Sequence, residues 1–189
     1  MNEVVKMLTT INENKSVGEQ LSALKAFDHL TIAQLNYLTS PRFVKDKEAA
    51  LVFHYLGFEK LKNHIPDLLL FLQDMNWPAG DLVSELLIKF GEPVIPHIQT
   101  VFQSSSDDIW CSWIIIYIVR KWDKSFTFKL KDDLINVVKS PNYVGSSIES
   151  LKVLRDILLK SDFENLYQIL LEKLENHEYF KQELLDSFK

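Results

Sequence analysis

Residues 65–90 read IPDLLLFLQDMNWPAGDLVSELLIKF, and this stretch decides the fold. Its second half places Leu82, Val83, Leu86, Leu87 and Phe90 at steps of three and four residues, which is the period of an amphipathic α-helix. The same spacing recurs along most of the chain, whereas the apolar/polar alternation of a half-buried strand is hard to find. The sequence therefore predicts an all-α fold.

The same stretch opens an internal repeat. The block 65–73 (IPDLLLFLQ) is echoed 30 residues later by the block 95–103 (IPHIQTVFQ), and an acidic residue and a tryptophan follow each block. Helix pairs repeated at about this period stack into a solenoid. A third unit, with helices over 129–140 and 146–160, lacks both the Ile-Pro start and the tryptophan. We expect a HEAT-like helical-repeat solenoid, an α-α superhelix of the usual right hand, with about ten to twelve short helices.

Apolar spacing and capping residues together predict the individual elements. Thr31 and Asp107 are start signals, and glycines such as Gly57 and Gly91 are stop signals. The expected helices are 2–14, 17–28, 31–39, 44–56, 58–74, 78–90, 93–104, 108–122, 129–140, 146–160, 163–176 and 177–187. We assign residues 1–60 to helices that pack on the solenoid, 61–160 to the repeat core and 161–189 to acidic capping helices, all within one continuous domain.

Composition narrows the class of protein. Of the 189 residues, 47% are apolar and 25% charged, which suffices for a packed core and argues against disorder. The single cysteine, Cys111, rules out an intrachain disulfide and favours a reducing, cytoplasmic location. The N-terminus has no signal-peptide pattern, and the most apolar segment, 109–119, is too short for a membrane span of about 20 residues.

The same composition argues against several kinds of chemistry. A formal charge of −5 with no Lys/Arg cluster disfavours a nucleic-acid binder. The histidines are scattered singly, and neither a Gly-rich phosphate loop nor a nucleophile elbow occurs, so we expect no metal, no cofactor and no catalytic residues. Cys111 lies in an apolar helix, where a thiol is usually inert. Helix capping alone accounts for the acidic pairs Asp107-Asp108 and Asp132-Asp133.

The segment 65–122 resembles a bacterial family, domain of unknown function family 5071. The family's marks are the LQDMNWP stretch, complete here at Leu72 to Pro78, and a DDIW element, present as Asp107 to Trp110. Pro141 and Glu149 match a later proline and a Glu-containing helix. The resemblance implies a compact HEAT-like helical domain and implies no known activity.

The resemblance extends upstream to Lys25, Phe27 and Asp28 and covers roughly residues 21–160. This chain departs from the family pattern in an insert around 41–47, in Ala79-Gly80 after the Trp-Pro pair, in Cys111-Ser112 after the second tryptophan, and in its additional C-terminal helices.

Residues in these motifs have both a structural and a functional interpretation. Capping and buried-tryptophan packing, worth about 1 and roughly 3 to 5 kcal/mol, explain the motifs without a ligand. The functional interpretation places the tryptophans and acids on a recognition surface for a protein partner, since exposed tryptophans are common interface residues. The acidic segment 161–189 is a second candidate surface, for a basic partner. The candidate partner-binding residues are Asp74, Asn76, Trp77, Asp107, Asp108, Trp110, Trp113, Glu172 and Glu175.

The hypothesis favoured by these features is a non-enzymatic protein-binding module that requires no membrane, nucleic acid or cofactor. Its most concrete form is a bacterial immunity protein that neutralises a basic toxin. A second hypothesis is a nucleic-acid-acting enzyme or binding factor on a HEAT-like scaffold, for which a basic groove would be needed. A third is a regulatory scaffold, which the sequence does not separate from the first.

Overall fold

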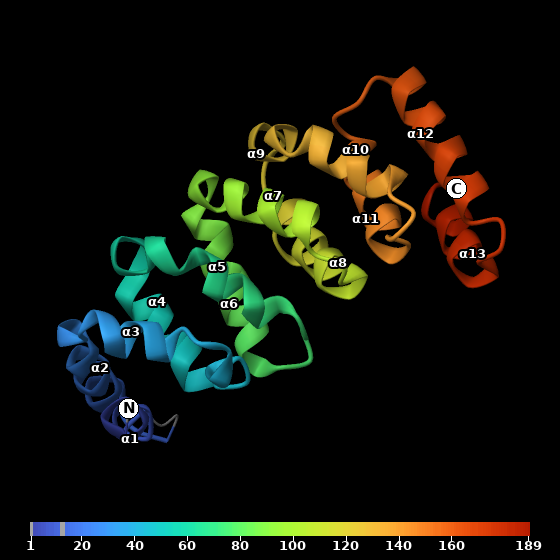
Figure 1. Cartoon of the computed structure of the whole chain (residues 1–189). Coiled ribbons are helices and arrows are strands. Elements are labelled where there is room, and N and C mark those ends of the chain that lie inside the picture. The colour runs from blue at the N-terminus through green and yellow to red at the C-terminus, as the bar shows by residue number, and fades with distance from the viewer. Residues whose placement is uncertain (1, 12–13) are drawn as a thin grey trace. The chain divides into compact units, whose positions relative to one another are not determined.

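A computed structural model describes residues 2–11 and 14–189, all of them in helices or in the turns that connect helices (Figure 1). None of the described residues lies in a strand, so the all-α prediction is confirmed. The chain divides into two compact units, Met1–Phe90 and Gly91–Lys189. This division falls elsewhere than the borders expected after residues 60 and 160, and those borders remain predictions.

The first unit is built around the packing of α4 on α6. Its α-helices are α1 (Asn2–Leu8), α2 (Val17–Lys25), α3 (Ile32–Leu38), α4 (Lys47–Leu61), α5 (Ile65–Leu69) and α6 (Pro78–Phe90), with 3-10 turns at Ala26–His29, Pro41–Phe43, Lys62–His64 and Leu70–Leu72. Phe27, Phe53 and Phe71 are fully buried, and the rings of Phe53 and Phe71 meet edge to face at 5.4 Å. These aromatic side chains form the centre of the unit's core.

Gly57 interrupts α4 as its position in the sequence predicts. Its φ of 68° lies in the left-handed region, which glycine adopts readily and other residues rarely do. The helix expected over 58–74 is wrong, because a 3-10 turn at Lys62–His64 ends it and α5 starts a new helix. Pro66 is the second residue of α5, where its missing N–H removes no helical bond.

The two repeat blocks have the same local structure at their starts. In each, a 3-10 turn leads into an α-helix whose first two residues are Ile-Pro, at Ile65–Leu69 and at Ile95–Ser104. The blocks then differ, since the first tightens into a 3-10 turn at Leu70 and the second stays α-helical to Ser104. The sequence echo therefore marks a repeated helix start.

The second unit continues with short helices. They are α7 (Ile95–Ser104), α8 (Asp108–Tyr117), α9 (Lys124–Lys129), α10 (Lys131–Lys139), α11 (Gly145–Leu154), α12 (Lys160–Lys173) and α13 (Glu178–Ser187), with 3-10 turns at Glu92–Val94 and Val119–Lys121. The unit begins at Gly91, whose φ of 67° is again left-handed. α11 is the most deeply buried of these helices, with eight of its residues inside.

Contacts between the helices of the second unit follow a regular order. α7 contacts α8, and α10 contacts α11, so successive helices form pairs. α7 also contacts α10, and α8 contacts α11. One step further along the chain, α10 contacts α12 and α11 contacts α13. α11 also contacts α12. α7 and α8 thus each touch the corresponding helix of the pair formed by α10 and α11.

The helix expected over 108–122 ends five residues early. α8 ends at Tyr117, and after Ile118, whose φ is −117° and ψ −65°, the chain tightens into the 3-10 turn Val119–Lys121. Asp123 then caps an additional helix, α9, by accepting hydrogen bonds from the N–H groups of Ser125 and Phe126. The alternation of Phe126 and Phe128 with polar residues hides α9 from a search for helical spacing.

Other helix ends also differ from the expectation. α1 stops at Leu8, and part of the remaining expected segment to residue 14 lies outside the described residues. α11 starts at Gly145, so Ser146 and Ser147 are buried first-turn residues and neither occupies the N-cap position. Among the described residues, we find no helix with the length and apolar content needed to cross a membrane.

Candidate functional site

The Asp74–Trp77 loop leads into α6 in the first unit. Asp74 Oδ1 accepts hydrogen bonds from the backbone N–H of Asn76 at 3.0 Å and from its side-chain amide at 2.8 Å. Asp74 therefore closes a tight turn just before Pro78, a usual role for an aspartate in a loop. The loop was expected to cap α6, but these two hydrogen bonds of Asp74 both go to Asn76 within the loop.

Trp77 is half-buried in this loop, and its ring faces a cation. Lys45 Nζ lies 4.8 Å from the ring centroid, which is within the range of a cation–π interaction. Lys45 belongs to the segment expected to be an insert, so the insert residue and the family's tryptophan are neighbours. The Trp77 ring is therefore partly exposed to solvent and has the Lys45 ammonium as a neighbour.

Asp107 and Asp108, adjacent in sequence, have different roles. Asp107 is exposed and caps α8 by accepting a hydrogen bond from the N–H of Trp110 at 3.0 Å. Asp108 is half-buried, and its two carboxylate oxygens accept from the N–H groups of Val144, Gly145 and Ser146 at 2.9 to 3.2 Å. Asp108 thus caps α11 from a different helix. Both carboxylates therefore accept hydrogen bonds from backbone N–H groups at helix starts.

The tryptophans of the second unit are not on one helix. Trp110 and Trp113 lie on α8 and are half-buried, and Trp113 packs edge to face on Tyr117 at 5.7 Å. Trp122 lies beyond the end of α8 and is only 9% exposed. The expected single helix carrying all three is therefore wrong, and the pair on α8 combines packing with partial exposure.

Glu172 and Glu175 are exposed at the end of α12. The neighbouring Lys173 does not neutralise them, because its ammonium points inward and donates to Val138 O at 3.0 Å and Ser147 Oγ at 2.8 Å. Glu178 is also exposed, and Tyr179 beside it is 76% exposed. We call Glu172, Glu175, Glu178 and Tyr179 the acidic surface.

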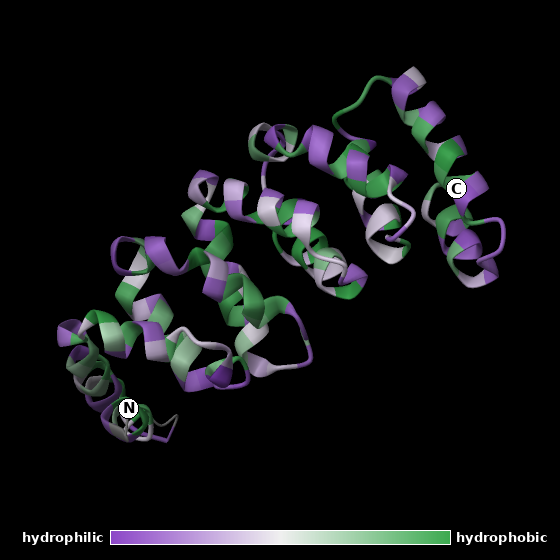
Figure 2. Ribbon diagram, in the orientation of Figure 1, coloured by the Kyte–Doolittle hydropathy of each residue, from purple (hydrophilic) through white to green (hydrophobic). Residues whose placement is uncertain are grey.

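The adjoining face of α13 is hollowed. Tyr179, Gln182, Glu183, Asp186 and Ser187 line a cavity of about 420 Å³. Polar residues and apolar residues alternate along α12 and α13 (Figure 2). An exposed aromatic ring therefore stands beside carboxylates, on helices that also supply the core residues Leu170 and Leu184.

A buried ion-pair cluster lies at α11. Glu149 is 7% exposed, and its carboxylate accepts hydrogen bonds from Arg120 Nη1 at 2.9 Å and Lys152 Nζ at 2.6 Å. In the sequence, Glu149 stands out only as a match to the family pattern, and no local pattern marks Arg120 or Lys152 as its partners. Arginine is rare in this chain, with only Arg42, Arg120 and Arg155. This rarity was the feature of the sequence that could have drawn attention to Arg120.

Three buried titratable groups lie around α8 and α11. Burial raises the pKa of the Cys111 thiol to about 12 and that of Tyr143 to about 12. Burial also lowers the pKa of Lys173 to about 8. A thiol with so high a pKa carries no thiolate at neutral pH, which argues against a nucleophile at Cys111.

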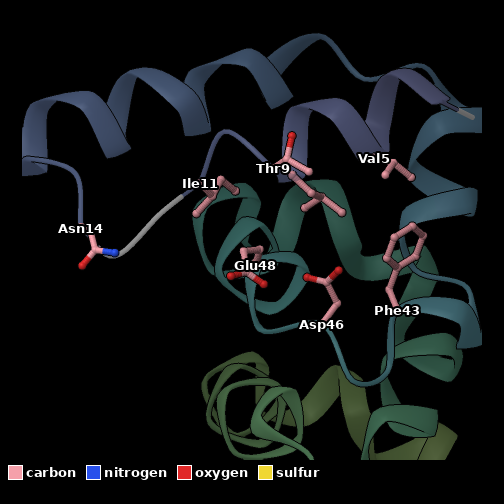
Figure 3. A pocket seen from close by; sticks show the side chains of 8 residues that line it. Val5, Thr9, Ile11, Asn14, Phe43, Asp46 and Glu48 are labelled. Atoms are coloured by element: carbon pink, nitrogen blue, oxygen red, sulfur yellow. The ribbon is translucent and has the colours of Figure 1, made fainter.

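A cavity of about 520 Å³ lies in the first unit between the N-terminal helix and the start of α4. Figure 3 shows the apolar side chains of Val5, Ile11 and Phe43 and the carboxylates of Asp46 and Glu48 among the residues that line it. Asp46 is already the cap of α4, accepting from the N–H of Ala49 at 3.0 Å. Within the described part of the chain, no three His, Cys, Asp or Glu side chains are grouped so that they could hold a metal ion.

The candidate residues fall into separate groups. Asp74, Asn76 and Trp77 share one loop of the first unit, Asp107, Asp108, Trp110 and Trp113 lie at or on α8, and Glu172 and Glu175 lie at the end of α12. The second and third groups are in the same unit and lie on different helices.

These features define an all-helical protein with a capped Trp-Pro loop and a repeated Ile-Pro helix start. Residues 41–158 match the model of a protein family described as Domain of unknown function (DUF5071), and the chain belongs to this family. The matched range includes the expected insert at 41–47 and leaves residues 21–40 and the acidic surface outside. No curated protein and no solved structure matches the chain.

Proposed function

We propose that this protein is a non-enzymatic protein-binding module built on a HEAT-like helical repeat. The ordered contacts of the second unit support the repeat, because paired helices that each touch their counterpart in the next pair are the arrangement of an α-solenoid. The engaged carboxylates of Asp107 and Asp108 and the raised pKa of Cys111 are consistent with a role other than catalysis.

The observation that carries the proposal is the acidic surface. Three exposed glutamates, Glu172, Glu175 and Glu178, lie within seven residues of Tyr179, which is 76% exposed. The ammonium of Lys173, in the same segment, is turned inward. Tyrosine is enriched at the energetic centres of protein interfaces, and charge around such a centre raises the rate of encounter with an oppositely charged partner. A basic protein is therefore the partner that fits.

The most specific form of the proposal is a bacterial immunity protein that neutralises a basic toxin by covering its charged surface. A cytoplasmic location belongs to the same proposal, because the single thiol of Cys111 is free and buried and suits a reducing compartment. A regulatory scaffold would use the same surface, and the identity of the partner separates the two roles.

The test is capture of proteins from a native lysate of the source cell on the tagged full chain, with identification by mass spectrometry. The proposal expects one basic protein in stoichiometric amount, released by the double charge reversal Glu172→Lys and Glu175→Lys and weakened by Tyr179→Ala.

Matched control variants distinguish loss of the acidic surface from a general effect of changing the net charge or truncating an exposed side chain. Glu59→Lys with Glu85→Lys makes the same change in net charge at exposed positions of the first unit, and Ile109→Ala truncates a side chain that is 64% exposed on α8. These controls should keep the partner. An empty capture at low salt, or a partner lost equally from test and control variants, would contradict the proposal.

A further inference from the structure

A second surface of the unit Gly91–Lys189 has the opposite chemistry to the acidic surface. A cavity of about 710 Å³ is lined by four cationic side chains, Arg120, Lys124, Lys152 and Arg155. Two of the three arginines in the chain therefore face one cavity of an otherwise acidic protein. Arginine is the side chain best suited to pair with carboxylates through several N–H donors.

A buried carboxylate holds two of these cations in place. Glu149, on the most buried helix of the unit, accepts from both Arg120 and Lys152. One carboxylate thus faces two cations, and a guanidinium has five N–H donors, of which Glu149 takes only those of Nη1. The hydrogen bond to the buried Glu149 carboxylate holds the Arg120 side chain in position, and the other N–H groups of its guanidinium can donate to a ligand.

Other charges also face this cavity. Lys152 Nζ lies 3.5 Å from Glu183 Oε1 in addition to its hydrogen bond to Glu149. With two carboxylate partners, Lys152 is the most neutralised of the four cations. Asp123 and Asp156 also line the cavity, and Asp123 Oδ1 accepts hydrogen bonds from the N–H groups of Ser125 and Phe126. The exposed carboxylate of Asp156 is the remaining opposing charge. The cations left to bind a ligand are therefore Arg120, Lys124 and Arg155.

Arg155 and Lys124 are both exposed. The guanidinium of Arg155 is also held in position by a neighbouring aromatic ring. Its guanidinium carbon lies 5.5 Å from the centroid of the Phe188 ring, within cation–π range. Stacking of this kind leaves the edge of the guanidinium open to a carboxylate.

An apolar surface adjoins the cationic cavity. A second cavity, of about 560 Å³, shares Lys124, Asp156 and Ile157 with the first and adds Phe128, which is 55% exposed. The two cavities are therefore neighbours, one cationic and one apolar. An exposed aromatic ring beside fixed cations matches a ligand that carries an apolar group beside its carboxylates.

We propose that this pair of cavities binds an acidic polypeptide segment in which an apolar side chain lies between carboxylates. The carboxylates pair with Arg120, Lys124 and Arg155. The apolar side chain packs on Phe128 and Ile157. This site shares Ser187 with the hollow beside Tyr179, but its lining is cationic, so it selects a partner of the opposite charge to the one proposed for the acidic surface.

The experiment measures binding of the full chain to a fluorescent array of ten-residue peptides. Each peptide carries Asp or Glu residues around one Leu or Phe, and matched arrays replace the acids by Lys or the apolar residue by Ser. The proposal expects the acidic apolar peptides to bind in low salt and the lysine array not to bind. Amide chemical shifts should change at Phe128 and Ile157.

Two substitutions test the site without disturbing the buried carboxylate. Lys124→Gln with Arg155→Gln should weaken binding by about tenfold or more, since two charge-assisted contacts are lost. The matched control, Lys139→Gln with Lys160→Gln, removes the same charge from exposed positions of the same unit and should change binding little.

Three results would overturn the proposal. The first is the absence of binding by every acidic apolar peptide. The second is equal weakening by the test and control pairs. The third is equal binding of the peptides in which Ser replaces the apolar residue, together with full displacement by inorganic phosphate. That result would show a site that binds oxyanions and makes no use of the apolar side chain.

Discussion

Asp108, in the first turn of α8, caps α11 through the backbone N–H of Ser146, with Oδ1 at 3.0 Å from that nitrogen. The other carboxylate oxygen accepts from Gly145 at 2.9 Å. α11 supplies Glu149 and most of the buried polar residues of the second unit. By capping α11, the Asp108 side chain holds in place the helix on which the packing of this unit depends.

Replacing Asp108 should destabilise the second unit. Asp108→Ala leaves several partly buried N–H groups without their acceptor, and we expect a loss of roughly 2 to 3 kcal/mol in the free energy of unfolding, measured by urea denaturation. Asp107→Ala is the control, because it removes an exposed cap worth only about 1 kcal/mol. Equal losses in the two variants would contradict the bridging role of Asp108.

Lys173 should make stability depend on pH. Its pKa is about 8 because burial disfavours the ammonium, whereas the ordinary value is 10.5. Between these values the unfolded chain binds this proton and the folded chain does not, so the free energy of unfolding rises with pH. The rise between about pH 8 and 9 should be at most about 1 kcal/mol, reduced by screening because the side chain is partly exposed.

The measurement for Lys173 is urea denaturation at several pH values, compared with Lys173→Met. The comparison is needed because Cys111 and Tyr143 act in the opposite direction, their folded pKa values of about 12 lying above the ordinary 9.0 and 10.0. The wild-type minus variant difference should increase with pH. A difference that stays flat would show that the Lys173 ammonium is as well solvated as in the unfolded chain.

Cys111 should resist thiol reagents while the protein is folded. It is fully buried, and its raised pKa leaves almost no thiolate at about pH 8. We expect its reaction with a chromogenic disulfide to be slow in buffer and fast in urea. Rapid stoichiometric labelling of the folded chain would contradict the buried position.

The left-handed glycine of α4 should be costly to replace. Gly57 has φ 68° and open space where a Cβ atom would lie, so Gly57→Ala tests backbone strain alone, and we expect a loss of about 1 kcal/mol. Gly18→Ala, in α2 and also with open space, has no left-handed φ and should be neutral or stabilising. Equal effects of the two substitutions in urea denaturation would show that the backbone at Gly57 is not constrained.

Local signals in the sequence predict local structure well in this protein. α6 has the expected bounds because Pro78 starts it, the apolar spacing is regular and Gly91 follows its last residue. Thr31 and Asp107 cap their helices as expected. These features depend on residues within one or two turns of each other, which a sequence pattern records.

The features that the sequence did not reveal depend on distant residues. Asp108 meets Ser146 across 38 positions, and Arg120 meets Glu149 across 29. No periodicity links such pairs, because tertiary packing alone brings them together. The exposed Tyr179 was likewise not identified, since a tyrosine two residues into a helix is equally typical of a core position.

The measurement that tests the central proposal most directly is the association rate constant of the captured basic partner with the full chain, at low and high salt. The account predicts that this rate falls by about tenfold or more in high salt and falls similarly in Glu172→Lys with Glu175→Lys, while Glu59→Lys with Glu85→Lys leaves it nearly unchanged. An association rate that is indifferent to salt and to the Glu172 and Glu175 reversals would contradict binding through the acidic surface.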